Sequence, residues 1–207
     1  MTLAQAECPR PPDDFADRNL PVHVMDLTAT ALMRIHQTVN APIFYNRRST
    51  SNSPCRFDAP ADEYGVLYAA QTFSACMFET IIRGRFEGGS LPLLVDKHLL
   101  ATRSVAHLGL AGARSLRLAD FTQSLAPLGG NAAVLSTPDY AISQAWSVAV
   151  YSHPGQCDGL YFRSRYSGEP CVALFDRAGV VVRGESVPLM DEPLLGYFLD
   201  RYQVWIC

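Results

Sequence analysis

Residues 66–80 read VLYAAQTFSACMFET. A continuous apolar run at 66–70 is followed, after Gln71 and Thr72, by a second stretch in which the apolar residues recur with a different spacing. The first five residues predict a short strand, and the apolar positions after them recur at the spacing of a helix. Apolar side chains also cover the other side of this helix, so we expect both of its faces to be buried. Glu79 is the only charged residue between Glu63 and Arg83. The stretch therefore predicts a strand–helix unit in the core that carries one carboxylate.

The carboxylate of Glu79 needs an explanation. A carboxylate in apolar surroundings is costly unless it is paired, protonated or in contact with a ligand. One interpretation is a structural residue neutralised by a nearby arginine. The other is a catalytic or substrate-orienting group in a cleft, and the surrounding residues alone leave both open.

The size and charge of the chain restrict its partners. Its 207 residues, 48% hydrophobic and 18% charged, are typical of one globular domain with a substantial core. The net charge of −3 offers no electrostatic footprint for nucleic acid or an anionic membrane. No apolar run approaches the length of a membrane span. Small anionic ligands remain compatible, because arginines cluster locally within 47–48, 83–85 and 163–165.

The cysteines and the N-terminus bear on the compartment and the domain boundary. The six cysteines are scattered without a CxxC pair, which argues against a disulfide framework and indicates a reducing compartment. Residues 1–22 are dominated by proline and charge and lack the apolar segment of a secretory signal. We therefore expect an extended or mobile arm at 1–22, a single domain at 23–207, and a cytoplasmic protein.

The rest of the chain predicts strands and helices without regular alternation. Residues 31–36 fit a strand or a helix, and residues 46–60 read as a long polar loop. Further strands are predicted at 43–45, 91–95, within 105–118, at 159–162 and 171–175, with a hairpin turn at 176–179 leading into 180–182. A short helix is predicted at 120–125, a second with Thr137 as its cap and Pro138 at its first position, and a third with Asp191 as its cap. This order favours an α+β fold over a doubly wound sheet.

Common catalytic and cofactor motifs are absent from the sequence. It contains no GxGxxG, Walker A or GxSxG pattern. The five histidines show no HExxH or other ligand spacing, so we expect no metal site. A Cys–His nucleophile stays open, because such partners need not be close in sequence.

A constellation of polar residues remains, in a fixed order along the chain. Arg34 interrupts an apolar run, and Arg56 lies in the polar loop. Tyr68 and Glu79 lie on the strand–helix unit, and Ser164 ends the strand-like stretch that begins DGLY at residue 158. Together these features resemble the RES domain family, named for an Arg, a Glu and a Ser. The resemblance runs from about residue 34 to residue 175 and is most specific in VLYAA with Glu79 and in DGLY with Ser164.

The resemblance carries expectations about fold, function and partners. Family members degrade NAD, either as toxins of bacterial toxin–antitoxin pairs or as stand-alone relatives. The implied fold is a single compact mixed α/β domain similar to ADP-ribosyltransferase toxins. The resemblance also implies a cognate antitoxin, typically a helix-turn-helix protein, and is compatible with a homodimer.

Residue by residue, the resemblance implies that Glu79, Arg34 and Tyr68 are catalytic and that Arg56 and Ser164 bind substrate. The family's second arginine usually stands in a Gly-Gly-Arg-Trp-like turn, whereas residues 54–58 here read PCRFD. Arg47 or Arg48 is therefore the alternative for this position.

The chemistry of NAD suits these side chains. Arginine recognises phosphate bidentately, so Arg34 and Arg56 would clamp the pyrophosphate or an incoming phosphate. Glu79 would stabilise the positive charge that builds on the ribose as the glycosidic bond breaks. Tyr68 would contact the nicotinamide or the ribose, and Ser164 a phosphate or ribose oxygen.

Each residue also has a structural alternative. Arg34 could pair with a carboxylate, Arg56 could be a solvated loop charge, and Tyr68 a core strand residue. Ser164 could cap local backbone groups.

The acceptor determines the name of the reaction. Water gives a glycohydrolase, and inorganic phosphate as co-substrate gives a phosphorylase that yields nicotinamide and ADP-ribose 1″-phosphate. A protein or nucleotide acceptor gives an ADP-ribosyltransferase, and a module that binds without turnover is the remaining alternative. NAD enters each enzymatic scheme as a substrate, so no further cofactor is expected.

Overall fold

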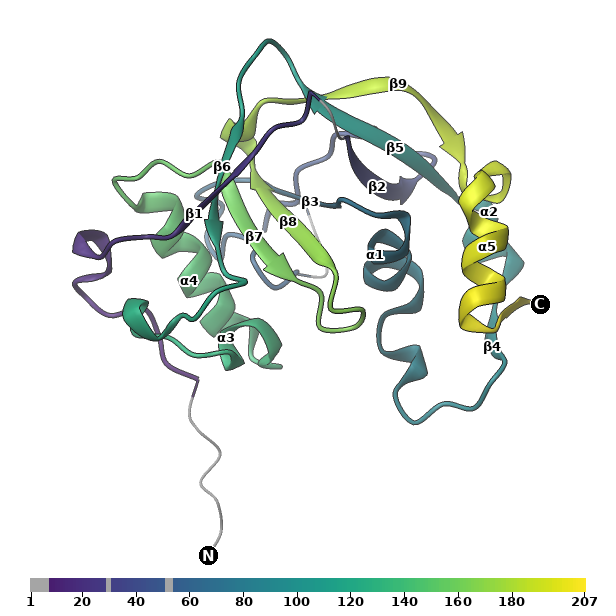
Figure 1. The fold of residues 1–207 in the computed structure, drawn as a ribbon, viewed down its shortest axis with the longest axis horizontal. Coiled ribbons are helices and arrows are strands. Elements are labelled where there is room, and N and C mark those ends of the chain that lie inside the picture. Colours follow the sequence, from purple (N-terminus) through teal and green to yellow (C-terminus); the bar gives the residue numbers. More distant parts are fainter. Residues whose placement is uncertain (1–7, 29–30, 51–53) are drawn as a thin grey trace, which may run out of the picture.

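A large mixed sheet organises the chain (Figure 1). The computed structural model describes residues 8–28, 31–50 and 54–207, and in these ranges eight strands hydrogen-bond in the order β1-β6-β7-β8-β3-β2-β5-β9. Neighbouring strands are antiparallel except β6 and β7. The strands are β1 Val22–Met25, β2 Leu32–Gln37, β3 Val66–Ala70, β5 Arg103–Leu110, β6 Leu116–Asp120, β7 Gly159–Arg163, β8 Pro170–Phe175 and β9 Val180–Pro188.

Helices gather at the two ends of this sheet. Figure 1 shows α4 beside β7 with α3 next to it, α1 beside β2 and β3, and α2 and α5 near the ends of β5 and β9. A parallel pair, β4 (Leu93–Val95) and β10 (Val204–Ile206), forms a separate small sheet beside α5. The α-helices are α1 Phe73–Met77, α2 Lys97–Ala101, α3 Ala133–Ser136, α4 Tyr140–Ser152 and α5 Pro193–Tyr202. The predicted single mixed α/β domain is confirmed, and no described helix is long and apolar enough to cross a membrane.

The strand–helix unit predicted at residues 66–80 is present as β3 and α1. Thr72 caps α1, because its hydroxyl accepts the N–H of Ala75 at 3.1 Å. The α-helical hydrogen bonding stops after Met77 and continues as a π-helical turn, Phe78–Ile82. Buried side chains cover both faces of these two turns, as predicted. π-Turns are rare and occur frequently at functional sites.

The strands β2 and β3 separate from each other after a single pairing. β2 pairs with β5 along its full length, from Leu32 to Gln37, but pairs with β3 only between Met33 and Ala70. The thiol of Cys76 on α1 donates to the Met33 carbonyl at 3.1 Å, which ties the helix to the point of separation. One side of β2 from residue 34 onward is therefore free of strand pairing.

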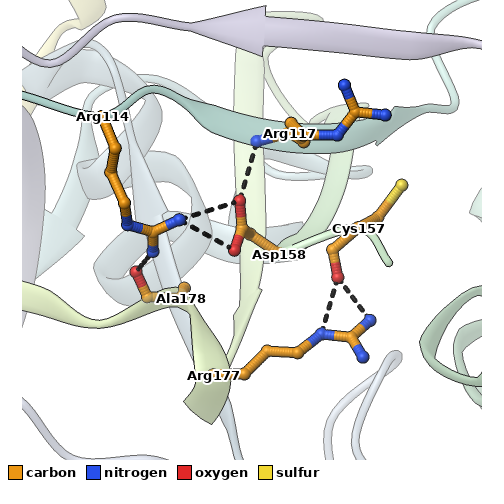
Figure 2. Close-up of polar contacts among 6 residues, drawn as sticks. All are labelled: Arg114, Arg117, Cys157, Asp158, Arg177 and Ala178. Atoms are coloured by element: carbon orange, nitrogen blue, oxygen red, sulfur yellow. Dashed lines mark hydrogen bonds and ion pairs between the residues drawn. The ribbon is translucent and has the colours of Figure 1, made fainter. Parts of the chain in front are cut away.

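The DG pair of the family-like stretch has a structural function. Figure 2 shows the carboxylate of Asp158 between the guanidinium of Arg114, at 3.2 Å, and the backbone N–H of Arg117, at 2.8 Å. The neighbouring carbonyl of Cys157 accepts from Nε of Arg177 at 2.8 Å. These contacts join β6, the start of β7 and the turn before β9.

The N-terminal segment is packed where the structure describes it. Phe15 is only 4% exposed and meets the ring of Trp146 edge-on at 5.5 Å between centroids. The indole N–H of Trp146 donates to the carbonyl of Pro9 at 2.8 Å. Residues 8–22 of the expected mobile arm thus contribute to the core, and residues 1–7 lie outside the described residues.

Several local predictions require correction. The stretch 31–36 is a strand, and 43–45 forms none, with only one bridge nearby between Asn46 and Val66. Residues 120–125 form a turn rather than a helix, because Oδ1 of Asp120 accepts the N–H of Thr122. The turn at 176–179 does not close a hairpin: β7 and β3 occupy both edges of β8, so β9 pairs with β5.

Two helix starts are also shifted. Asp139 rather than Thr137 caps α4, and Glu192 rather than Asp191 caps α5.

Candidate active site

A cavity of about 380 Å³ lies where β2 and β3 separate. Four residues expected from the sequence line it: Arg34, Arg56, Tyr68 and Glu79. They come from β2, the polar loop, β3 and the π-turn, so the fold brings together positions that are distant along the chain. Among the described residues that line this cavity, Glu79 is the only acidic one, against the five arginines Arg34, Arg56, Arg83, Arg163 and Arg165.

Glu79 is half-buried on the π-turn. Its carboxylate forms no ion pair or hydrogen bond with the described residues; the contact at this residue is from Nε of Arg83 to the backbone carbonyl, at 3.1 Å. No described residue therefore serves as the arginine partner that a structural ion pair of Glu79 would need. An unpaired carboxylate in a cavity is available to a ligand.

The turn after Glu79 is strained. Arg83 has a φ of 47° and a ψ of −135°, a region that residues other than glycine rarely adopt. Its side chain lines the cavity. Such strain persists where the surrounding structure enforces it, and it clusters at functional sites.

Arg34 is a half-buried cation that lines the cavity. Burial lowers the pKa of Arg34 to about 10. Its Nη1 donates to the carbonyl of Phe44 at 2.9 Å, and no carboxylate in the described ranges forms an ion pair with it. Burying an unpaired charge is costly, so this site favours an anionic ligand.

Arg56 lines the cavity and lies against the end of α3 and the start of α4. Its Nη1 donates to the carbonyl of Thr137 at 2.7 Å, and its guanidinium lies 4.9 Å from the ring centre of Tyr140. Burial lowers the pKa of Arg56, and the positive charge of Arg165 acts in the same direction. These contacts fix Arg56 as a positioned cation rather than a solvated loop charge.

Tyr68 holds the loop that carries Arg56. The Tyr68 hydroxyl accepts the N–H of Phe57 at 2.9 Å and donates to Oδ1 of Asp58 at 3.0 Å. Oδ2 of Asp58 accepts the N–H of Cys55 at 2.7 Å, while burial raises the pKa of this carboxyl. The loop, which lacks the glycines typical of the family, is thus fixed by side chains bonded to its backbone.

Arg47 and Arg48 lie elsewhere. Arg47 forms an ion pair with Asp176. Both arginines line a separate cavity of about 200 Å³, which they share with Asp58 but not with Glu79. The geometry favours Arg56 over these two as the arginine that faces Glu79.

Ser164 does not line the cavity. It is 3% exposed, and its hydroxyl accepts the N–H groups of Tyr166 at 3.1 Å and Ser167 at 3.2 Å. This is the backbone-capping arrangement that the sequence left as an alternative. The cap holds the turn after β7, from which Arg165 and Tyr166 reach the cavity. A direct contact between Ser164 and substrate stays a prediction.

Sequence reasoning did not assign several residues that line the cavity. They are Arg83, Arg163, Arg165, Tyr140 and Tyr166. The local arginine clusters at 83–85 and 163–165 were the signal for three of them. The two tyrosines add aromatic faces on which a planar ring can stack.

The thiols in the cavity are poor nucleophiles. Cys55, Cys76 and Cys171 line it, and burial raises the pKa of Cys55 to about 11 and of Cys76 to about 12. No histidine is among the described residues around this cavity, so a Cys–His pair finds no support there. Within the described ranges no group of three or more His, Cys, Asp or Glu residues is placed to hold a metal ion.

Comparison with known proteins adds two findings. A family model described as the RES domain matches residues 31–194, a range that contains every residue of the cavity. The fold is similar, with a TM-score of 0.63, to a chain in the crystal structure of the M. tuberculosis MbcT–MbcA toxin–antitoxin complex. That likeness covers 89% of this chain and 98% of the other at 13% sequence identity, so it concerns the fold alone. No curated protein matches the chain.

Proposed function

The chain belongs to the RES domain family, and from this premise we propose that it consumes NAD+ by cleaving the bond between nicotinamide and ribose. One observation carries the proposal: the carboxylate of Glu79, which forms no ion pair with the described residues, faces a cavity whose other charged lining residues there are all arginines. NAD+ is an anionic pyrophosphate with a cationic ring at one end, so its charges complement those of the cavity.

Cleavage needs a negative group near the ribose and positive groups near the pyrophosphate. Breaking the glycosidic bond builds positive charge on the ribose, which Glu79 would stabilise, and the electron pair leaves with nicotinamide. Arg34 and Arg56 both line the cavity and would hold the pyrophosphate. Tyr140 and Tyr166 would stack against a planar ring, and Tyr68 would keep the Arg56 loop in place.

The excess of arginine supports phosphorolysis over hydrolysis. With five arginines and one carboxylate among the described residues that line the cavity, its charge would favour a second phosphate beside the pyrophosphate. The products would be nicotinamide and ADP-ribose 1″-phosphate.

A toxin whose activity is held in check by a cognate antitoxin is the biological context that we propose. The support is family membership together with the fold likeness to a chain of a toxin–antitoxin complex. A helix-turn-helix antitoxin and action on the cytoplasmic NAD+ pool belong to the same proposal. Expression of the chain alone should deplete cellular NAD+, and co-expression of the antitoxin should restore it.

The test is NAD+ consumption by the purified protein, with and without inorganic phosphate, with products resolved by chromatography and mass. Nicotinamide together with ADP-ribose 1″-phosphate, formed only with phosphate, is the expected result. Glu79→Gln should abolish turnover, whereas Glu185→Gln, at an exposed position on β9, should not. Plain ADP-ribose would make the enzyme a hydrolase, and label on a macromolecule would make it a transferase. Undiminished turnover by Glu79→Gln would refute the assignment.

A further inference from the structure

A second cavity of about 220 Å³ adjoins the first on the free side of β2. We call it the side lobe. Arg34, Ile35, Asn46 and Thr80 line both cavities, so the two spaces meet at Arg34. The rest of its lining comes from the end of β2, the start of β5 and the segment after β2; the residues with polar side chains there are His36, Gln37, Asn40 and Arg103.

The side lobe has two cations and no acid among the described residues that line it. Arg103 opens β5 opposite Gln37 and forms no ion pair within the described part of the chain. Its Nε is buried and has no hydrogen-bond partner there. A buried donor without an acceptor costs about 1–3 kcal/mol, so the hydrogen-bonding capacity of the Arg103 guanidinium is not fully used by the described residues.

A third arginine adds to the positive field of the lobe. Burial lowers the pKa of Arg103, and the positive charge of Arg83 lowers it further. Arg34, with one of its donors bonded to the Phe44 carbonyl, faces the same space. No described carboxylate compensates these charges, and an anionic ligand would.

The remaining polar groups of the lobe are held by hydrogen bonds. Nδ1 of His36 is 2.9 Å from the Gln37 carbonyl, which assigns its proton to Nδ1, and Nε2 is 3.2 Å from the hydroxyl of Ser186. Both ring nitrogens are therefore engaged. Asn40 donates to Oε1 of Gln37 at 3.4 Å, which leaves the Gln37 amide N–H groups as further neutral donors.

We propose that the side lobe is a subsite for a phosphoryl group, with Arg34 and Arg103 as its charged ligands. Two guanidinium groups match the charge and planar bidentate geometry of a phosphoryl dianion. The volumes of about 220 Å³ for the lobe and about 380 Å³ for the main cavity would allow such a group beside a ligand in the main cavity. The identity of that group rests on the proposed function: it is either free inorganic phosphate or a phosphoryl group on the dinucleotide, such as the 2′-phosphate of NADP+.

In the first case the side lobe supplies the acceptor of the reaction. A phosphate oxygen forms the bond to C1″ of the ribose as the bond from C1″ to the nicotinamide nitrogen breaks. The bonding pair leaves with nicotinamide, which neutralises the charge of its ring. In the second case the lobe takes no part in bond making and selects NADP+ over NAD+.

Binding of inorganic phosphate to the purified chain, measured by calorimetry, tests the subsite without any turnover. Arg103→Gln should weaken phosphate binding about tenfold or more, because a charge-assisted bidentate contact is lost. Arg117→Gln makes the same charge change at an exposed position on β6 and should leave binding unchanged. Asn40→Glu, at an exposed lining position, places a negative charge at the lobe without disturbing the core and should weaken binding as well.

Kinetics then distinguish the two sources. A raised KM for phosphate with an unchanged KM for NAD+ identifies the lobe as the acceptor site. A raised KM for NADP+ alone identifies it as the site of the 2′-phosphate. The proposal is overturned if Arg103→Gln and Asn40→Glu both bind phosphate and use phosphate and NADP+ as the wild type does. Failure of the proposed function is a separate result, namely no nicotinamide released by the wild type while phosphate binding still depends on Arg103.

Discussion

Replacing Tyr68 with phenylalanine removes one hydroxyl and leaves the ring in place. The hydroxyl accepts the N–H of Phe57 and donates to Asp58. Phe57 is fully buried, so its N–H would lose its partner at a cost of about 1–3 kcal/mol. Asp58 would lose one donor but keep the N–H of Cys55. We expect Tyr68→Phe to lower the free energy of unfolding by about 2–4 kcal/mol at neutral pH.

The loss should depend on pH, with a definite sign. Burial raises the pKa of Asp58 above its usual value, and the Tyr68 hydroxyl partly opposes this. A carboxyl whose folded-state pKa is raised contributes stability at low pH, and this contribution is lost as the pH rises through that pKa. Tyr68→Phe raises the pKa of Asp58 further. The stability difference from wild type should therefore be smallest below about pH 4 and grow toward neutral pH.

Urea unfolding across this pH range is the assay, with Tyr64→Phe as the matched control. Tyr64 is also buried, and its hydroxyl donates to Ser147 at 2.7 Å, but it neither bonds to Asp58 nor lines the main cavity. Both variants should be destabilised, yet only Tyr68→Phe should show the pH dependence and a raised KM for NAD+, because its loop carries Arg56. A stability loss below about 1 kcal/mol, or one equal at pH 4 and pH 7, would refute this reasoning.

Three further predictions concern the site and the sheet. Arg34→Met should change the free energy of unfolding by no more than about 1 kcal/mol, because the mutation removes a charge that burial desolvates. The same variant should raise the KM for NAD+ at least about tenfold. A large stability loss in urea unfolding would instead make Arg34 a structural residue. Arg83→Gly should be more stable than Arg83→Ala by about 1 kcal/mol, because only glycine adopts a φ of 47° with a ψ of −135° without strain; equal melting temperatures would contradict the strain. Gly159→Ala should cost more than about 3 kcal/mol or prevent folding, because a Cβ there would lie 2.3 Å from the Ala173 carbonyl oxygen. The control Gly196→Ala, with open space around it in α5, should fold normally.

The sequence predicted elements that are encoded locally. Three local features favour a strand–helix unit here: the apolar strand before Thr72, the Thr72 hydroxyl as a cap, and the helical spacing of apolar residues after it. The sequence therefore predicted β3 and α1 at the correct positions. The π-turn at Phe78–Ile82 was not predicted, because its register depends on how the helix packs rather than on its composition. The pairing of β9 with β5 was missed for a similar reason, since a turn at 176–179 favours a hairpin locally.

The candidate site was predictable in part. Arg34, Arg56, Tyr68 and Glu79 were assigned through the family resemblance, and the fold places them around one cavity. The sequence did not predict that the Tyr68 hydroxyl bonds to the Phe57 N–H and so holds the loop that carries Arg56. This contact depends on how the loop folds against β3.

The side lobe was likewise beyond sequence analysis. Arg34 and Arg103 meet through the register of β2 against β5 and the early separation of β2 from β3. Neither feature has a local signature in the chain. Pairing between distant strands is a property of the whole sheet.

The most direct test of the central claim is a crystal structure of the Glu79→Gln variant soaked with NAD+. This variant should bind NAD+ without consuming it. We predict that C1″ of the nicotinamide ribose lies beside residue 79, with the pyrophosphate held by Arg34 and Arg56. An NAD+ molecule bound elsewhere, or one whose nicotinamide ribose lies away from residue 79, would contradict the account.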